Sequence, residues 1–415
     1  MSLHIQYIGY GNESLPLFTP EHASLLEVND PEKTVTPEAF ILRLRSAIQN
    51  QNLDLSSPVI VVADKTRLCG YPEYLPLLVD ELVAQGMDTT TLKFIIAYGT
   101  HPPQTREECV AAYGEIYDTY TFIHHDASDK NIFTELAVTQ KNTPVRMRKD
   151  LLEASAIITM GAVCHHYFAG YGGGRKLIFP GCGEKESIYA NHSLFLDGDN
   201  QKLASGCQPG NLSGNPLADD LFEVEEHLPA HLSIHGLLDS HGTLCNLLVG
   251  SGRKLFDEAC EAQGNSCEIS SDQFDTVVAS CGGFPKDINF IQAHKAIHNS
   301  AMLVKDGGLL LVYCECRDGI GSTTFLPWFD KGSFETSFTL LAENYEGNGG
   351  TALAMMTKLQ RIRIGLVTSI NPELLTKIGV ERWDHNQVCE HIANVGQEES
   401  IACIPNASLL VKKSI

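Results

Sequence analysis

The sequence has no long apolar run, and basic residues are scarce. No stretch approaches the roughly 18 consecutive apolar residues that a membrane-spanning helix needs. The first residues, MSLHIQYIGYGNESLPL, lack the basic segment and apolar run of a secretory signal. Thirty Lys and Arg stand against 51 Asp and Glu, a formal net charge of −21, and so acidic a surface repels nucleic-acid phosphates. These absences predict a soluble, cytoplasmic protein that binds neither membranes nor nucleic acids.

Several common signatures are missing as well. The chain contains no His-Glu-x-x-His and no Cys-x-x-Cys pair, which argues against a zinc site. Its 13 cysteines, an odd number without regular spacing, fit a reducing compartment better than a disulfide framework. Neither a Walker A loop nor the dinucleotide pattern Gly-x-Gly-x-x-Gly occurs. A P-loop enzyme is thereby excluded and an NAD-dependent enzyme is disfavoured.

What the sequence does contain is an alternation of buried strands and amphipathic helices. Near-continuous apolar runs, typical of parallel strands buried on both faces, occupy residues 58–64, 92–98, 156–160, 275–280, 309–313 and 362–368. Helix-like segments cover residues 37–51, 74–85 and 105–113. This pattern predicts two α/β domains with largely parallel sheets and a cleft between them. We place the first domain at residues 1–270 and the second at 271–415, and the last helix is compatible with a return to the first domain.

Two of the predicted strands end in groups suited to a ligand, because open α/β sheets bind ligands at the carboxyl ends of their strands. The first group is Asp64-Lys-Thr66-Arg67, in which the guanidinium can hold a carboxylate or phosphate by two hydrogen bonds. The second is Gly99-Thr-His101-Pro-Pro, where two prolines stiffen the loop that presents an imidazole. The alternative for the first group is a solvated turn, and the alternative for the second is a surface histidine.

The densest group is the segment from Cys164 to Gly181, followed by Asn191-His192. Its glycines, including Gly172 to Gly174, give backbone amides access to a phosphate, which Arg175 or Lys176 can neutralise. A flexible loop is the alternative. In the second domain, Gln292 and Lys295 share a helix face and can point a donor and a cation into the cleft.

Other residue pairs in the second domain carry a weaker signal. His294 and His298 lie four residues apart on the same predicted helix, and packing or surface placement is their expected fate. Cys314-Glu-Cys316 follows a predicted strand and is expected to contribute buried thiols.

Taken together, these groups resemble the lactate racemase family, whose enzymes carry a nickel-pincer nucleotide. The resemblance lies in five motifs in the same order over some 230 residues. They are Asp64-x-Thr-Arg67, Gly99-Thr-His101, His166-Tyr-Phe-Ala-Gly-x-x-Gly-Gly-Arg-Lys176, His192, and Gln292-x-x-Lys295.

The resemblance implies a role for each matching residue. Lys176 matches the lysine attached covalently to nickel(II)-pyridinium-3,5-bisthiocarboxylic acid mononucleotide, and His192 matches the imidazole that ligates nickel, which favours square-planar geometry. His101 and His166 match the acid/base residues on opposite faces of the substrate. Arg67, Gln292 and Lys295 match substrate-binding residues, and further cofactor contacts match Asp64, Thr66, Arg67, Gly172, Gly173 and Gly174. Arg67, Arg175, Lys176 and Lys295 are the expected local cluster of positive charge.

The implied function is that of an isomerase, a racemase or epimerase of 2-hydroxy acids. It implies reversible hydride transfer through a 2-oxo acid, with histidines of near-neutral pKa moving the hydroxyl proton. The implied partners are the proteins that make the cofactor and insert its nickel. Ile291, where lactate-specific members have tyrosine, and Gly172, where serine is common, leave the substrate open. An NAD-dependent 2-hydroxyacid oxidoreductase and a non-catalytic anion- or nucleotide-binding protein are the alternatives.

Overall fold

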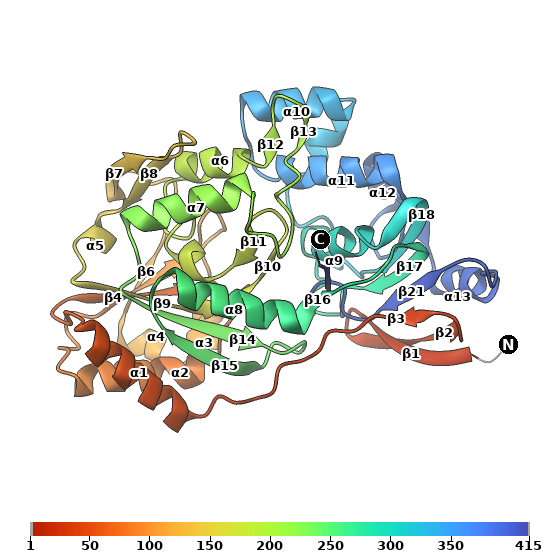
Figure 1. Ribbon diagram of the computed structural model, residues 1–415. Helices are drawn as coiled ribbons and strands as arrows, with labels where there is room; N and C mark the ends of the chain where they lie inside the picture. Colours follow the sequence, from red (N-terminus) through yellow and green to blue (C-terminus); the bar gives the residue numbers. More distant parts are fainter. Residues whose placement is uncertain (1–2, 414–415) are drawn as a thin grey trace. The chain divides into compact units, whose positions relative to one another are not determined.

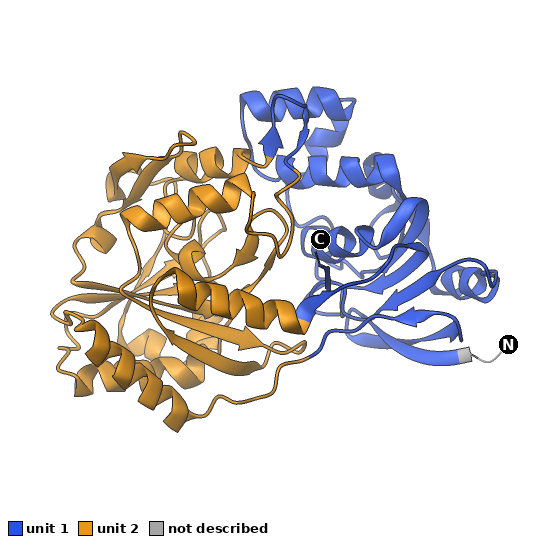
Figure 2. Ribbon diagram, in the orientation of Figure 1, with its two compact units in different colours: residues 1–29, 196–204, 267–415 blue, residues 30–195, 205–266 orange. Residues whose placement is uncertain are grey.

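The computed structural model describes residues 3–413, and their contacts divide the chain into two compact units. Unit 1 contains residues 1–29, 196–204 and 267–415, and unit 2 contains residues 30–195 and 205–266 (Figure 2). The change at Cys267 lies close to the boundary predicted at residues 270–271. That the first 29 residues group with the C-terminal part of the chain is a feature that the sequence did not reveal.

Unit 2 is built on a six-stranded sheet with the order β15-β14-β9-β4-β5-β6 (Figure 1). Neighbouring strands are parallel except for β14 and β15, which form an antiparallel pair. Every residue of β4 and β9 is buried, as is expected of central parallel strands covered on both faces. The strands are β4 (Pro58–Ala63), β5 (Lys93–Ala97), β6 (Thr121–His124), β9 (Ala156–Ala162), β14 (Leu232–Leu238) and β15 (Leu244–Gly250).

The helices of unit 2 begin where the sequence supplies caps. Thr36 caps α1, and Thr105 and Glu108 form a capping box at the start of α3. The helices are α1 (Pro37–Gln51), α2 (Tyr71–Ala84), α3 (Arg106–Tyr113), α4 (Ile116–Thr119), α5 (Lys149–Leu152), α6 (Lys185–Ser193), α7 (Pro216–His227) and α8 (Gly252–Cys267). Two antiparallel hairpins pair β7 (Phe133–Val138) with β8 (Pro144–Arg148), and β10 (Cys164–His166) with β11 (Gly170–Gly172). Short 3₁₀ turns, η1 (Lys130–Ile132) and η2 (Gly174–Leu177), complete the unit.

Unit 1 contains a second six-stranded sheet, with the order β20-β19-β18-β17-β21-β3, in which every neighbouring pair is parallel. Its strands are β3 (Ser24–Leu25), β17 (Phe274–Ser280), β18 (Val304–Tyr313), β19 (Arg363–Val367), β20 (Glu381–Trp383) and β21 (Ile401–Ile404). The antiparallel ribbon of β1 (Leu3–Tyr10) and β2 (Glu13–Pro20) buries Ile8 and Leu17 in the core that this sheet forms. Hydrophobic packing therefore fixes the N-terminal segment in unit 1.

The last described strand also belongs to unit 1. After β21, the strand β22 (Val411–Lys412) pairs with β16 (Glu268–Ile269). The helices here are α9 (Phe290–Ala301), α10 (Phe334–Glu343), α11 (Gly349–Arg361), α12 (Pro372–Ile378) and α13 (His385–Ala393), with η3 (Leu326–Asp330) and the hairpin β12 (Leu196–Asp197) and β13 (Lys202–Leu203).

The predicted α/β class with largely parallel sheets is confirmed in both units. Within the described residues, no helix combines the length and the apolar character needed to cross a bilayer. The predicted cleft between two domains stays a prediction.

Candidate active site

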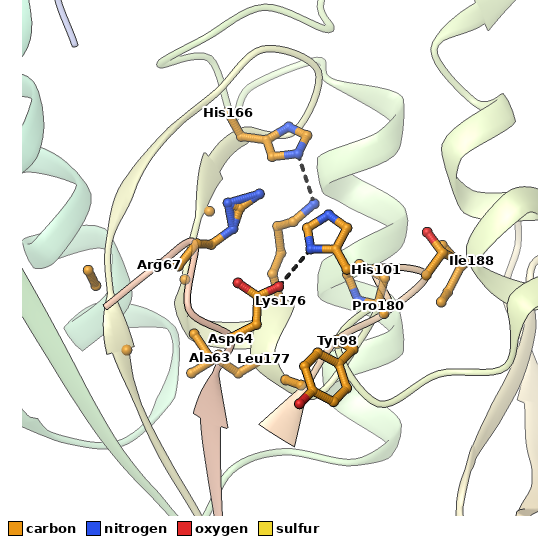
Figure 3. Close-up of a pocket in the computed structure, with 18 of the residues that line it drawn as sticks. Ala63, Asp64, Arg67, Tyr98, His101, His166, Lys176, Leu177, Pro180 and Ile188 are labelled. Atoms are coloured by element: carbon orange, nitrogen blue, oxygen red, sulfur yellow. Dashed lines mark hydrogen bonds and ion pairs between the residues drawn. The ribbon is translucent and has the colours of Figure 1, made fainter. Parts of the chain in front are cut away.

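One pocket in unit 2 gathers most of the residues selected from the sequence. It lies where β4, β5 and β9 end, the usual ligand-binding edge of a parallel sheet. Figure 3 shows side chains from these separate segments converging on it. The predicted residues that line it are Asp64, Arg67, His101, His166, Gly172, Gly173, Lys176 and His192.

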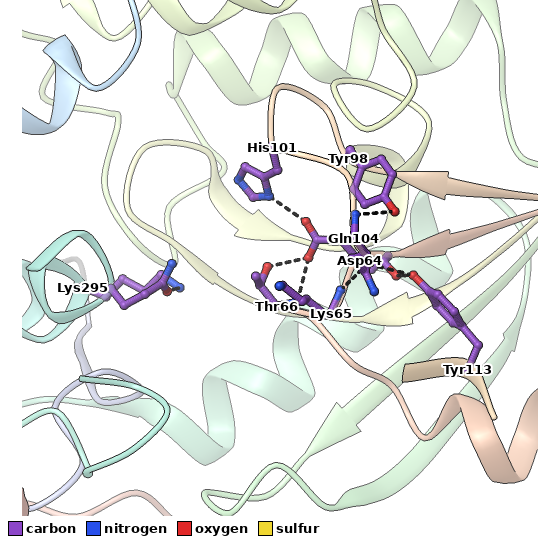
Figure 4. Close-up of polar contacts among 10 residues, drawn as sticks. Asp64, Lys65, Thr66, Tyr98, His101, Gln104, Tyr113 and Lys295 are labelled. Carbon is purple, nitrogen blue, oxygen red and sulfur yellow. Dashed lines mark hydrogen bonds and ion pairs between the residues drawn. The ribbon is translucent and has the colours of Figure 1, made fainter. Parts of the chain in front are cut away.

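Asp64, the first residue after β4, is a buried carboxylate whose two oxygens have different partners. Oδ1 accepts hydrogen bonds from the Thr66 N–H and hydroxyl, and Oδ2 lies 2.6 Å from Nδ1 of His101 (Figure 4). Burial alone would raise the pKa of Asp64, but the hydrogen bonds with His101 and Thr66, the electrostatic interaction with His101 and the nearby Arg67 together lower it to about 2. The carboxyl group is therefore ionised and accepts the His101 Nδ1–H.

The loop that carries His101 is held by a network of buried polar groups (Figure 4). The Tyr98 hydroxyl accepts the Gln104 N–H at 3.1 Å. Oε1 of Gln104 in turn accepts the Lys65 N–H at 2.9 Å and the Tyr113 hydroxyl at 3.3 Å. These bonds tie the loop after β5 to the turn after β4. The imidazole of His101 stays half exposed at the pocket while its backbone is fixed.

His166 ends β10 and is oriented by the turn that follows it. Its Nδ1 accepts the backbone N–H groups of Phe168 at 3.3 Å and Ala169 at 3.1 Å. Its Nε2 lies 3.4 Å from Nζ of Lys176, and a dashed line marks this contact in Figure 3. Burial, and then the nearby positive charges of Arg67 and Arg175, hold the pKa of Lys176 well below its usual range.

The glycine run makes a turn too tight for side chains. Gly173 has φ +77°, and a Cβ there would lie 2.3 Å from the Ala162 carbonyl oxygen. Gly174 has φ +53° and abuts the Phe256 ring. Within the described residues Gly174 and Thr66 do not line the pocket; Thr66 acts through Asp64.

Arg175 does not join the predicted cluster of positive charge. Its guanidinium lies 3.9 Å above the Phe222 ring and 4.7 Å from that of Phe256, and the residue is 3% exposed. Burial lowers its pKa to about 10. In this respect the sequence-based expectation is wrong: adjacent residues of a 3₁₀ turn point to different sides, so that Lys176 lines the pocket and Arg175 does not.

His192 reaches the pocket from α6, and a buried carboxylate anchors that helix. Asp220 accepts a hydrogen bond from Asn191 Nδ2 at 2.8 Å and from the hydroxyls of Thr139 and Thr143. Burial, and next the charge of Lys176, lowers the pKa of His192 to about 3. The imidazole is therefore neutral, which is the form that ligates metals.

Among residues 3–413, no group of three or more His, Cys, Asp or Glu side chains is arranged to hold a metal ion. A metal at His192 would therefore need its other donors from a bound ligand.

The remaining predicted residues lie in unit 1. Gln292 and Lys295 are on α9, where Lys295 Nζ donates to Gln292 Oε1 at 2.8 Å. Their contact with a substrate stays a prediction. Cys314 and Cys316 are buried, as their pattern predicted, and His294 is buried as well.

Sequence reasoning missed three residues that position the site. Tyr98 lines the pocket and, with Gln104, braces the His101 loop, and Asp220 anchors α6. The sequence could have indicated Tyr98, because this tyrosine ends a predicted strand. The partners of Gln104 and Asp220 come from distant segments, so sequence spacing held no information about them.

Two sequence profiles match the chain. The lactate racemase N-terminal domain matches residues 9–204, and the lactate racemase C-terminal domain matches residues 269–352. Lactate racemase from Thermoanaerobacterium thermosaccharolyticum is 29% identical over 275 residues, 66% of this chain and 63% of that protein. Lactate racemase from Lactiplantibacillus plantarum is 26% identical over 269 residues, 64% of this chain and 62% of that protein. These matches span less than two thirds of either relative.

Solved structures share the fold over nearly the whole chain. The lactate racemase apoprotein from T. thermosaccharolyticum superposes with a TM-score of 0.88 at 24% identity, covering 99% of this chain and 100% of that one. A protein from Thermotoga maritima gives a TM-score of 0.68 at 15% identity, covering 92% of this chain and 100% of that one.

Proposed function

The chain belongs to the lactate racemase family, and from this premise we propose that it is a racemase or epimerase of 2-hydroxy acids. One observation carries the proposal: two histidines from different segments, a lysine whose pKa is held well below its usual range and a neutral buried histidine line a single pocket. The curated relatives named lactate racemase make lactate the first substrate to test.

The pocket fits the nickel-pincer nucleotide in the chemistry of its donors. Lys176 supplies an amine of strongly lowered pKa for covalent attachment, and His192 supplies a neutral imidazole for nickel. The tight turn at Gly173 brings the chain into the pocket wall just before Lys176. When bound, this group supplies an acceptor and donor of hydride. We propose it as the cofactor, supplied by partner proteins that make it and insert its nickel.

The protein's own residues handle the proton and the substrate. Nε2 of His101 takes the hydroxyl proton, and the ionised carboxylate of Asp64 stabilises the imidazolium that forms. Arg67 holds the substrate carboxylate, so that a planar 2-oxo acid can turn without leaving the pocket. His166 serves the opposite face of the substrate.

The test uses protein co-expressed with the cofactor-making enzymes and checked for its adduct by intact mass. Chiral chromatography over a panel of 2-hydroxy acids, with lactate first, should show racemisation or epimerisation of at least one. His101→Gln and His166→Gln should each keep the adduct and lower kcat by about 10²–10⁴-fold. His241→Gln, at an exposed site in a turn, is the control and should keep full activity. Silence of the adduct-bearing protein over the whole panel would refute the proposal.

A further inference from the structure

We propose that the protein holds its two pocket histidines in opposite neutral tautomers. His101 carries its proton on Nδ1 and presents a bare Nε2, whereas His166 has a bare Nδ1 and presents Nε2–H. At rest the pocket thus has one proton acceptor and one proton donor. The catalytic meaning of this difference rests on the proposed function, but the tautomers themselves do not.

The tautomer of His101 follows from its partner. An ionised carboxylate can only accept hydrogen bonds, and Oδ1 of Asp64 already accepts two from Thr66. Oδ2 lies 2.6 Å from His101 Nδ1, the short distance of a charge-assisted hydrogen bond. The proton between them belongs to Nδ1. Since a neutral imidazole has a single ring proton, Nε2 is bare.

The tautomer of His166 follows from the opposite kind of partner. A backbone N–H can only donate, and the amides of Phe168 and Ala169 both point at Nδ1. Nδ1 is therefore bare, and the ring proton is on Nε2. Nε2 faces Nζ of Lys176 at 3.4 Å, a contact in which the lysine must then be the acceptor. The depressed pKa of Lys176 agrees with this direction.

The two faces of a substrate consequently meet different chemistry. His101 can take a hydroxyl proton at once, whereas His166 must first lose its Nε2 proton. Acylation of Lys176 Nζ would remove the lone pair that accepts this proton, so that Nε2–H would become available as a donor. For a true racemase kcat/KM is equal in both directions because enantiomers have equal free energy. We therefore expect the difference between the two faces to appear as unequal kcat values for the two directions, with KM changing in proportion.

The experiment uses unloaded protein labelled with ¹⁵N-histidine, at about pH 8, above the ordinary titration range of histidine. Long-range ¹H–¹⁵N correlation distinguishes the protonated ring nitrogen from the bare one. His101→Gln and His166→Gln assign the two rings. His231 is the reference, because its Nδ1 accepts the backbone N–H of Ile157 at 3.0 Å and so must show the Nε2–H pattern. We expect His166 to match His231 and His101 to show the reverse.

Asp64→Asn provides a second arm. Thr66 continues to bind the side-chain oxygen, which turns the new NH₂ group toward His101, so the His101 proton should move to Nε2. The pattern of His166 should not change. The same tautomer for both histidines in the wild-type protein would overturn the inference, as would an unchanged His101 in a folded Asp64→Asn variant. The wild-type spectrum decides alone if that variant does not fold.

The two proposals fail separately. Opposite tautomers in a protein that racemises nothing would refute the proposed function and leave the inference standing. Equal tautomers in an active racemase would do the reverse.

Discussion

Lys176 is the residue whose chemistry is easiest to test without an activity assay. Burial holds the pKa of its amine well below the usual range, and the amine faces His166. We expect Lys176→Ala to abolish the covalent adduct in protein co-expressed with the cofactor-making enzymes, whereas Lys185→Ala, in the first turn of α6, should keep it. Intact mass spectrometry measures both. An adduct of unchanged mass on Lys176→Ala would contradict the assignment.

Asp220 anchors the helix that carries His192. Its carboxylate accepts three side-chain hydrogen bonds, and one of them comes from the residue next to His192. Asp220→Ala leaves those buried donors unpaired, and we expect a loss of about 2–5 kcal/mol in unfolding free energy. Denaturant unfolding followed by circular dichroism measures this loss. Asp219→Ala, on the same helix, is the control. An Asp220→Ala variant as stable as the wild type would show that the network does not anchor α6.

At the residue scale, spacing located the pocket residues but not the direction in which each points. Histidines and glycines at strand ends were sufficient to select His101, His166 and Gly173. Arg175 was assigned to the ligand because it adjoins Lys176, yet it packs against two aromatic rings. The direction in which each side chain of a turn points depends on tertiary packing, and sequence spacing carries no information about that packing.

At the scale of elements, Tyr71 joins the carboxyl ends of two central strands. Its hydroxyl accepts the Ala63 N–H of β4 at 2.8 Å and donates to the Met160 carbonyl of β9 at 2.9 Å. Tyr71→Phe leaves both backbone groups buried and unpaired. We expect a loss of about 1–3 kcal/mol in unfolding free energy and faster hydrogen exchange at Ala63.

Tyr7→Phe is the matched control, because Tyr7 is 66% exposed on β1. Its effect should stay within about 0.5 kcal/mol. Equal effects of the two substitutions would contradict a structural role for the Tyr71 hydroxyl.

The central parallel strands of the unit 2 sheet were predictable from the sequence, whereas β14 and β15 at one edge of that sheet were not. Continuous apolar runs predicted β4, β5 and β9 to within a few residues. The strands β14 and β15 were not predicted, because Ser233, His235 and Asn246 interrupt their apolar pattern. The polar side chains of β14 are nevertheless buried: Ser233 lies beside the Thr159 hydroxyl, and His235 packs against Phe256.

At the scale of the whole molecule, the assignment of residues 1–29 to unit 1 was beyond sequence reasoning. The strand that adds them to the second sheet, β3, has only two residues. So short a strand leaves no periodic signal, and its partner β21 lies more than 370 residues away. Such pairing is decided by the burial of Ile8 and Leu17, which becomes visible only once the core is assembled.

The loss of stability in acid is a property of the whole fold, because every buried neutral histidine contributes to it. Burial, and for His125 also the charge of Arg148, lowers the pKa of both His125 and His235 to about 4. The unfolded chain takes up these protons near the ordinary histidine pKa of about 6.5. The contribution of each histidine to the free energy of unfolding is therefore fully present above that pH and is lost as the pH falls toward 4. The loss is about 2 kcal/mol per histidine between about pH 7 and pH 5.

His125→Gln keeps a side-chain donor for the Gly183 carbonyl, which His125 Nε2 contacts at 3.1 Å, and removes the titrating group. Denaturant unfolding at both pH values should therefore show a drop about 2 kcal/mol smaller than in the wild type. His241→Gln, at an exposed turn, should leave the drop unchanged. If His125→Gln loses as much stability as the wild type, the buried imidazole must bind its proton without cost. That result would mean that the segment after β6 opens to water in acid before the rest of unit 2 unfolds.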